Sequence, residues 1–409
     1  MEKIRIAVRK FEPFETTLQK LWNLFCQRNN LSIEAEMIPM ELHDLYEETI
    51  TNEGLKNGDW DIADINTDWI LEAANEKAVV DLTSLIEKKA PQNYPEGWHQ
   101  SLLHLQQIDG KTFGLPFHDG PECLIYRKDL FENTIEKENF QKQFGYELHP
   151  PKTWEQFTQI ATFFNRPDEN LYGCVFANYP DGHNMVFDFC LQLWTRRGSL
   201  LNAQNRISIN HPEAVQALDY YRKIVNNPET THPKSKQFDS VEAGMAFAKG
   251  EAALTINWFG FASMCEVIKE SKVKGKVDIT YLPHDRHCNT ASLNVYWLYT
   301  IGTGSKHQQL AYDFLRFAIT PESDALLTQE GGIGCRKSTW NHPEINASIP
   351  FYHKLEMLHE NALTLPQTPH WPKVAELIDQ MVLKAINSDI SSQELLKTTQ
   401  LLINQINSI

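Results

Sequence analysis

The sequence predicts an α/β protein of two lobes, each built around a doubly wound sheet flanked by helices. Its 409 residues are too many for one compact core. Strand and helix patterns also alternate three times before residue 80, with strands expected at 3–9, 32–37 and 61–65. Between them, apolar residues fall on one helical face at 14–25 and at 42–49. Sheets of this kind bind ligands at the carboxyl ends of their strands.

The same alternation resumes after residue 118, which predicts a second lobe of the same class. Its expected strands are 122–127, 252–258 and 277–282, and its expected helices include 153–164 and 212–225; strand 112–116 precedes this lobe and strand 296–301 follows it. Asp109-Gly110 is a hairpin-type turn. Three pairs in capping-box spacing predict helix starts: Thr153 with Gln156, Ser305 with Gln308, and Ser391 with Glu394.

The two lobes are expected to be discontinuous in sequence. Residues 1–117 and 289–320 are assigned to the N-terminal lobe, and residues 118–288 and 321–409 to the C-terminal lobe. This follows because strand 296–301 is expected to return to the first lobe. A chain that crosses more than once makes a hinge rather than a flexible linker, and we expect the ligand cleft between the lobes.

Composition narrows the class of partner. Acidic residues outnumber basic ones 53 to 38, for a formal charge of −15, which disfavours nucleic acid or an anionic membrane surface. No apolar run approaches the roughly 20 residues that span a bilayer. Seven scattered cysteines without a CxxC pair give no readable disulfide framework. Ten Trp, thirteen Tyr and twenty-one Phe are enough to build cores and to leave some rings for a sugar.

Three collinear motifs carry a family resemblance. They are DGKTFGLP at 109–116, YRKDLF at 126–131 and PPKTW at 150–154. Together the motifs resemble the family 1 extracellular solute-binding proteins, the maltose-binding-like receptors of ABC importers. The resemblance covers essentially the full length and implies the two-lobe class II periplasmic-binding-protein fold. It implies a receptor that binds and closes, with a membrane permease as partner.

The resemblance also implies where a sugar binds. In that family the segment after the third strand contacts the sugar, and an aromatic late in the second lobe forms a platform, here Trp258. A second aromatic precedes a C-terminal helix, here Trp371 with His370. The loop G-x-x-P-x-R corresponds to residues ending at Arg336, although Gly334-Cys335 replaces its usual proline. The full expected ligand-binding set is Glu12, Asn66, Asp68, Trp69, His118, Asp119, Glu122, Tyr179, Asn257, Trp258, Trp297, Arg336, His370 and Trp371.

Several of these residues have a second interpretation. His118 and Asp119 either hydrogen-bond a ligand or satisfy their own loop, and Arg336 either binds a ligand oxygen or braces its loop. Any one of the tryptophans is as well explained by a place in a core. Pyranose faces pack on indole rings while ring-edge hydroxyls need polar partners, so aromatic residues at the ends of elements favour the sugar interpretation.

Other chemistries lack their required patterns. Gly110-Lys111-Thr112 has Leu105 where a phosphate-binding loop needs glycine, and glycines 331–334 fail the dinucleotide spacing. His284 to Cys288 carries three donor types but no partner pair for a zinc site, which favours a turn. There is no G-x-S-x-G elbow. The sequence therefore predicts no catalytic residue, no metal and no cofactor.

We interpret the sequence as a receptor that captures a small polar ligand, a mono- or oligosaccharide or a sugar acid, by hinge closure. One alternative is a glycoside hydrolase that uses cleft carboxylates such as Asp68, Asp119 and Glu122. Another is a cytoplasmic or chemotactic sugar sensor on the same fold. Met1-Glu-Lys-Ile-Arg begins a strand without signal-peptide features. We expect a mature chain whose precursor is periplasmic or extracellular and lipid-anchored, or a cytoplasmic protein if Met1 is the native start.

Overall fold

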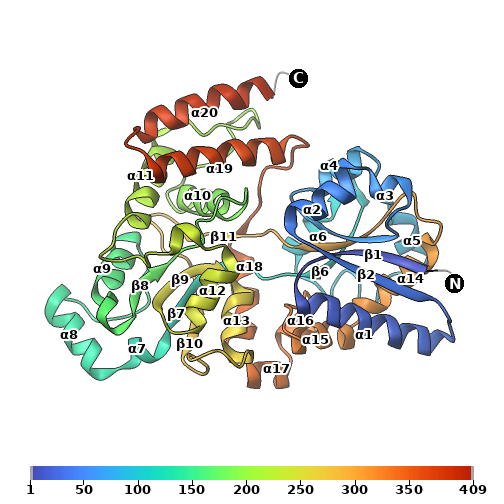
Figure 1. Cartoon of the computed structure of the whole chain (residues 1–409), viewed down its shortest axis with the longest axis horizontal. Helices are drawn as coiled ribbons and strands as arrows, with labels where there is room; N and C mark the ends of the chain where they lie inside the picture. The colour runs from blue at the N-terminus through green and yellow to red at the C-terminus, as the bar shows by residue number, and fades with distance from the viewer. Residues whose placement is uncertain (1–2, 407–409) are drawn as a thin grey trace. The chain divides into compact units, whose positions relative to one another are not determined.

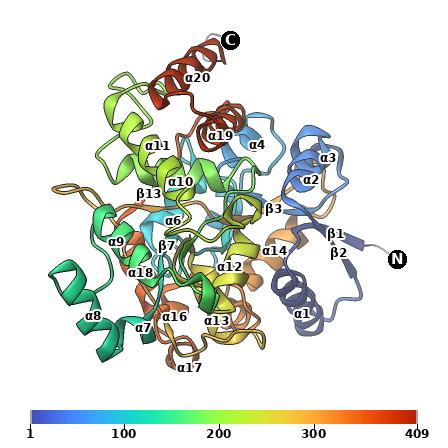
Figure 2. The same cartoon turned by 60° about the vertical axis from the view of Figure 1, so that its left-hand side comes forward.

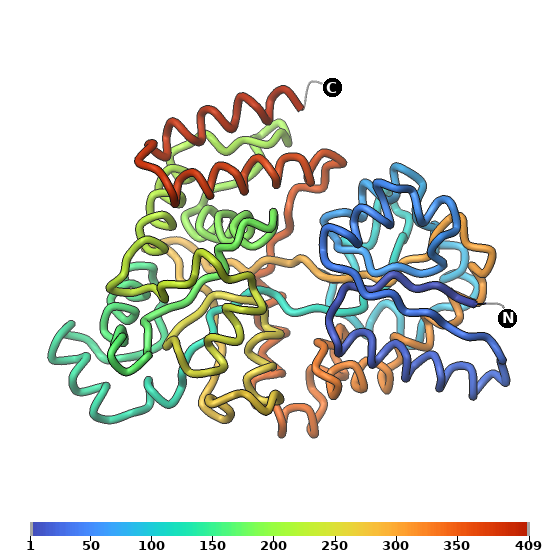
Figure 3. Tube along the Cα trace, viewed as in Figure 1, coloured from blue at the N-terminus to red at the C-terminus, as the bar shows by residue number. Residues whose placement is uncertain are grey.

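The computed structural model describes residues 3–406, and it divides into two compact units. Unit 1 comprises residues 1–120, 294–347 and 367–369, and unit 2 comprises 121–293, 348–366 and 370–409. The division differs from the expected boundaries, because residues 321–347 join unit 1 and the first two crossings come at 120/121 and 293/294. The colour ramp of Figure 3 lets the reader follow these passages between the units.

Unit 1 is built on a five-stranded sheet in the order β2-β1-β3-β12-β6. Its strands are β1 (Lys3–Arg9), β2 (Glu34–Met40), β3 (Ile62–Asn66), β6 (Leu115–His118) and β12 (Trp297–Ile301). β1 runs parallel to β2 and β3, while β12 runs antiparallel to both β3 and β6. The first residue of β12 therefore lies at the edge where β3 and β6 end.

Helices lie on both faces of this sheet, as expected for a doubly wound unit (Figure 1). The long ones are α1 (Glu12–Asn29), α14 (Gln308–Ala318) and α15 (Pro321–Gln329). The shorter elements are α2 (Leu42–Tyr46), the π-helix Glu47–Thr51, α3 (Gly54–Asn57), α4 (Ile70–Asn75), α5 (Thr83–Lys88), α6 (Gln100–Leu105), α16 (Lys337–Trp340), α17 (Pro343–Ser348) and the hairpin of β4 (Gln107–Ile108) with β5 (Lys111–Thr112).

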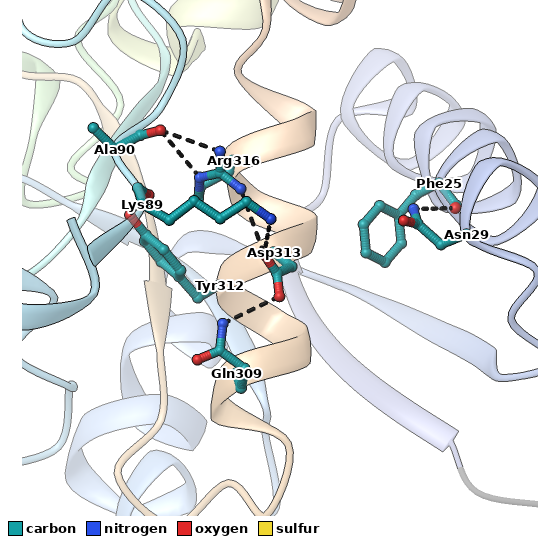
Figure 4. Close-up of polar contacts among 8 residues, drawn as sticks. All are labelled: Phe25, Asn29, Lys89, Ala90, Gln309, Tyr312, Asp313 and Arg316. Carbon is teal, nitrogen blue, oxygen red and sulfur yellow. Dashed lines mark hydrogen bonds and ion pairs between the residues drawn. The ribbon is translucent and has the colours of Figure 1, made fainter. Parts of the chain in front are cut away.

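Polar contacts fix α14 against the end of α5 in unit 1 (Figure 4). Tyr312 donates its hydroxyl to the Lys89 carbonyl at 2.8 Å, and the guanidinium of Arg316 donates twice to the Ala90 carbonyl at 3.2 and 3.1 Å. Asp313 accepts from Gln309 at 3.1 Å on the same helix. α14 follows β12 in the chain, so these contacts fix the helix that leads away from the strand beginning at Trp297.

Unit 2 is built on a four-stranded sheet in the order β10-β7-β9-β8. Its strands are β7 (Glu122–Arg127), β8 (Tyr172–Val175), β9 (Ala252–Trp258) and β10 (Val277–Thr280), with a small separate pair of β11 (Ser292–Leu293) and β13 (Ala362–Leu363). β7 is antiparallel to β9 and β10, and β8 is parallel to β9. β7 therefore begins at the edge where β9 ends.

The helices of unit 2 also lie on both faces of its sheet, with α10 and α19 on one side and α12 and α13 on the other (Figures 1 and 2). They are α7 (Lys128–Glu132), α8 (Thr134–Phe144), α9 (Trp154–Phe164), α10 (Asn184–Trp194), α11 (Pro212–Val225), α12 (Ser240–Ala248), α13 (Phe259–Val267), α18 (Leu355–Glu360), α19 (Trp371–Asn387) and α20 (Ser392–Ile406), with 3₁₀ turns at Pro167–Glu169, Ser235–Gln237 and Tyr352–Lys354. The predicted α/β fold with two units is confirmed.

Local signals at the helix starts are only partly confirmed. Thr153 and Gln156 form the full capping box that begins α9. Ser391 accepts the Glu394 amide at 3.2 Å. The predicted box at Ser305 is wrong, because α14 begins at Gln308 and Ser305 donates instead to Asp61 at 2.5 Å.

Neither a membrane span nor a disulfide is found in the described part of the chain. No helix between residues 3 and 406 is both long and apolar enough to cross a bilayer. All seven cysteines are free thiols. The segment His284 to Cys288 forms a turn, in which the Cys288 amide donates to the Asp285 carbonyl at 3.0 Å. No group of three metal-binding side chains occurs among the residues described.

Candidate functional site

The predicted residues of unit 1 converge on one sheet edge because of strand register. Trp297, the first residue of β12, pairs with Asn66 at the end of β3 and with His118 at the end of β6. Asp68 and Asp119 follow these two strand ends directly. An indole thus begins the central antiparallel strand, with polar side chains on both flanks.

Aromatic contacts hold the indole of Trp297. The ring of Trp69 meets it edge-on with centroids 5.8 Å apart, and Tyr46 meets Trp69 at 5.2 Å. Tyr46 donates its hydroxyl to Glu72 at 2.8 Å. Trp69 is buried while Trp297 is half-buried. Trp69 therefore acts as a support for Trp297 at this edge.

His118 is held in one neutral tautomer. Its Nδ1 accepts the Ile333 amide at 2.9 Å, so the ring proton is on Nε2. Phe14 of α1 packs against the ring with centroids 4.6 Å apart. Burial lowers the pKa of His118 to about 4, outweighing the charge of Asp119. At neutral pH the imidazole is uncharged and presents an N–H donor, which suits a hydroxyl oxygen.

Two expected residues of unit 1 lie differently. Glu12 opens α1 directly after β1 and is exposed. Arg336 is only 1% exposed, donating to the carbonyls of Ile319 at 2.8 Å and Gln92 at 2.9 Å, with its guanidinium 4.2 Å from the Trp98 ring centre. The structure thus uses Arg336 as a brace of the unit 1 core, and the site that we propose leaves it out.

The Arg336→Lys variant is therefore expected to lose stability and keep its ligand affinity. Lysine cannot serve both carbonyls and the indole face at once, and a hydrogen bond from a charged donor contributes about 1.5–3 kcal/mol. We expect the free energy of unfolding to fall by about 2–4 kcal/mol, measured by urea denaturation. A drop in affinity at unchanged stability would show that Arg336 contacts the ligand instead.

In unit 2 the predicted residues gather where β9 ends and β7 begins. Glu122, the first residue of β7, pairs with Trp258, the last of β9. Trp258 is half-buried, and Phe187 of α10 packs edge-on against it with centroids 5.6 Å apart. Tyr179 follows β8, the parallel neighbour of β9, and is 52% exposed. This edge therefore repeats the arrangement of unit 1, with an indole beside a polar side chain.

Three other expected residues of unit 2 have different surroundings. The amide of Asn257 is used internally, donating to the Ser240 carbonyl at 3.0 Å and accepting the Trp258 amide at 2.8 Å. Trp371 is 1% exposed at the start of α19, which is a core position. His370 precedes that helix without a side-chain capping hydrogen bond and is half-buried. Asn257 and Trp371 are left out of the proposed set.

A buried polar network behind Glu122 was missed from sequence. Asn178 donates to the Tyr221 hydroxyl, which in turn donates to Asp188. Burial, and secondarily the charge of Asp188, raises the pKa of Glu122 well above its usual range. Burial also raises the pKa of Asp188 to about 7, against the effect of the Tyr221 hydrogen bond. The detectable signal was an acid inside the otherwise apolar helix NMVFDFCLQLW.

The contribution of the Asp188 carboxyl to the free energy of unfolding is expected to fall as pH rises from about 4 to about 7. A carboxyl whose pKa is raised by folding favours the folded state below its unfolded pKa, and that contribution is lost as pH rises through the folded pKa. Asp188→Asn keeps an acceptor for Tyr221 and removes this slope. We compare the free energy of unfolding of the variant with that of the wild type at each pH. This difference should shift in favour of the variant by at least about 1.4 kcal/mol from pH 4.5 to pH 8.

Thermal denaturation at the two pH values measures this change. The exposed Glu138 on α8 provides a control, since Glu138→Gln makes a similar charge change outside the network. The prediction would be wrong if the stability of Asp188→Asn and that of the wild type changed by the same amount between pH 4.5 and pH 8.

Proteins of similar sequence are binding proteins. The family described as "Bacterial extracellular solute-binding protein" matches residues 23–350. A probable ABC transporter-binding protein of Deinococcus radiodurans is 22% identical over 72% of this chain and 68% of its own. A mannitol-binding protein of Pseudomonas aeruginosa is 24% identical over 64% of this chain and 59% of its own.

Solved structures share the fold along the whole chain. The maltose-bound T. maritima MalE3 protein superimposes with a TM-score of 0.85 at 23% identity, covering 99% of this chain and 100% of that one. A ribitol complex of a solute-binding protein from Agrobacterium radiobacter gives 0.87 at 22% identity, covering 99% and 98%. The chain therefore belongs to the family of bacterial extracellular solute-binding proteins, as a periplasmic or extracellular binding protein rather than an enzyme.

Proposed function

We propose that this protein is the receptor of an ABC importer for a mono- or oligosaccharide or a polyol, which it delivers to a membrane permease. The observation that carries the proposal is the repeated sheet edge. In each unit a half-buried indole, Trp297 or Trp258, lies beside hydrogen-bonding side chains at the end of neighbouring strands. An indole packs against the C–H face of a sugar while the polar neighbours bind its hydroxyls.

The proposed contacts follow from the chemistry of each side chain. The neutral His118 donates through Nε2, and the carboxyl and amide groups accept from hydroxyls. The proposed ligand-binding set is Glu12, Asn66, Asp68, Trp69, His118, Asp119, Glu122, Tyr179, Trp258, Trp297 and His370. Similar proteins include a maltose-bound protein, a ribitol complex and a mannitol-binding protein, which supports the choice of sugars and polyols. Attachment of the exported precursor to a lipid anchor is part of the same proposal.

A thermal-shift screen tests this function. Maltose, glucose, mannitol, ribitol, glucosamine, sorbitol and glucuronate are compared with amino acids as controls. A ligand at 100 times its Kd stabilises the folded state by about 2.7 kcal/mol, and we expect at least one sugar or polyol to do so without being converted. Steady product release from the stabilising compound, or stabilisation by amino acids only, would overturn the proposal.

Ligand is also expected to close a hinge made of the connections near residues 120, 293 and 347–370. A ligand that contacts both units in one state only shifts the equilibrium toward that state by its differential affinity. Small-angle X-ray scattering at saturating ligand should therefore give a smaller radius of gyration than the free protein. An unchanged scattering curve at saturation would contradict closure.

A further inference from the structure

Four carboxyl groups form a connected acidic row in unit 2. Its members are Glu122 at the start of β7, Asp181 before α10, Asp188 within α10 and Asp379 within α19. The charges of Glu122 and Asp188 interact, those of Asp188 and Asp181 interact, and Asp181 in turn interacts with Asp379. Figures 1 and 2 show α10 beside α19, the helices that carry two of the four groups.

This acidic row has no compensating cation. In the described part of the chain, no lysine or arginine forms an ion pair with any of the four carboxyls, whereas some half-buried acids of unit 2 do have one. Asp278, for example, is paired with Lys354 at 2.6 Å. The four groups also do not form a metal-binding cluster among the residues described. Carboxyls held together away from water either take up protons, the direction in which burial moves the pKa of Glu122 and Asp188, or are joined by a positive group.

Unpartnered acceptors beside the row point to a ligand. Glu122 is 4% exposed and its Oε2 has no hydrogen-bond partner, while Asn178 is 2% exposed and its Oδ1 has none. Asn178 borders the row, because its amide nitrogen donates to the hydroxyl of Tyr221 that binds Asp188. Asp379 Oδ1 is a third such atom. The Asn178 oxygen is an acceptor in any state, and the carboxyl oxygens of Glu122 and Asp379 are acceptors when ionised, so a cationic donor fits all three; buried polar groups are rarely left unsatisfied.

The outer end of the row is accessible. Asp181 is half-exposed, and the neighbouring Tyr179 is 52% exposed. Asp181 uses its oxygens to accept the amides of His183 and Asn184, both at 2.9 Å, which fixes the loop without neutralising its charge. Glu122 is the register partner of Trp258, so a ligand ring on Trp258 would lie beside this carboxyl.

Resting on the proposed function, we propose that the acidic row selects a cationic ligand, an amino sugar or amino polyol whose ammonium group binds at Glu122 and Asp188. An ammonium group supplies three N–H donors and one positive charge. It thus satisfies the unpartnered acceptors and neutralises the row at once, whereas a neutral hydroxyl supplies one donor and no charge. The sugar ring then packs on Trp258.

Matched pairs of ligands test the inference by isothermal titration at pH 7. The probes are D-glucosamine against D-glucose, and 1-amino-1-deoxy-D-sorbitol against D-sorbitol, with D-glucuronate as the anionic arm. Charge-assisted hydrogen bonds are the stronger class, so we expect the amino member of at least one pair to bind about tenfold to a hundredfold more tightly. D-glucuronate is expected to bind most weakly.

Two variants test whether the acidic row causes the preference for the amino ligand. Glu122→Gln, and independently Asp379→Asn, should reduce the amino-to-neutral affinity ratio about tenfold or more, while the exposed Glu138→Gln leaves it unchanged. Circular dichroism checks that each variant is folded. If neutral sugars bind as tightly as their amino counterparts, the cationic inference fails and the sugar receptor remains. If no sugar or polyol of any charge binds, the proposed function itself fails.

Discussion

The Trp371→Ala variant is expected to lose about 3–5 kcal/mol of folding free energy, which is typical of removing a core tryptophan. The ring is 1% exposed at the first turn of α19, between buried positions such as Val374 and Ile378 on the same helix. The sequence alone favoured a sugar platform at this position, since the residue precedes a long helix. Urea denaturation of the ligand-free protein measures the loss.

A second substitution at the same position separates packing from polar contact. The indole nitrogen of Trp371 is buried and has no hydrogen-bond partner in the part of the chain described. Trp371→Phe therefore gives up no hydrogen bond and keeps most of the buried ring, so it should cost far less than the alanine variant. If Trp371→Ala melts like wild type while ligand affinity collapses, the ring is a platform after all.

Strand and helix positions were well predicted where the chain carries its own boundary signals. The strands at 122–127 and 252–258 and the helix at 212–225 were predicted with their observed bounds, the last because Pro212 opens it. The expected strand 112–116 is wrong as one element. It divides into β5, which pairs with β4 through the Asp109-Gly110 turn, and β6, which joins the main sheet.

The break between β5 and β6 depends on contacts that are distant in sequence. Phe113 donates its amide back to Gln106 at 3.0 Å, and Gly114 lies so close to Leu298 that an added Cβ would be 3.0 Å from that side chain. Ser305 shows the same effect, since its bond to Asp61 replaces a local cap. Local pattern cannot reveal partners such as Leu298 and Asp61, which lie far away in the sequence.

The candidate site was predictable in outline, because residues at strand ends meet at one edge of an α/β sheet. The chain passes between the units at 120/121 and at 293/294, and the next strands are β7 and β12. Each of these strands runs antiparallel to its neighbours, so its first residue, Glu122 or Trp297, lies where the neighbouring strand ends. Two of the residues left out of the proposed set have polar atoms that are already used. Arg336 and Asn257 bind backbone carbonyls, and only the three-dimensional structure reveals those partners.

The Trp258→Ala variant should reduce affinity for the bound sugar or polyol about thirtyfold or more, with a modest change in the melting temperature of the free protein. Loss of stacking costs about 0.5–1.5 kcal/mol beyond area burial, and loss of ring burial adds about 1.5–3 kcal/mol. Stability should change less than at Trp371 because Trp258 is half-buried at a strand end.

Affinity is measured by titration calorimetry, and stability by thermal denaturation, for Trp258→Ala and Trp371→Ala together. The ligand is the sugar or polyol that gives the largest thermal shift with wild type. Trp258→Phe is the matched control, since a smaller aromatic ring retains part of the platform and should recover part of the affinity. If Trp258→Ala binds as wild type does but unfolds at a much lower temperature, Trp258 is a core residue. The sugar-facing edge of unit 2 would then have to be sought at Tyr179, which is 52% exposed after β8.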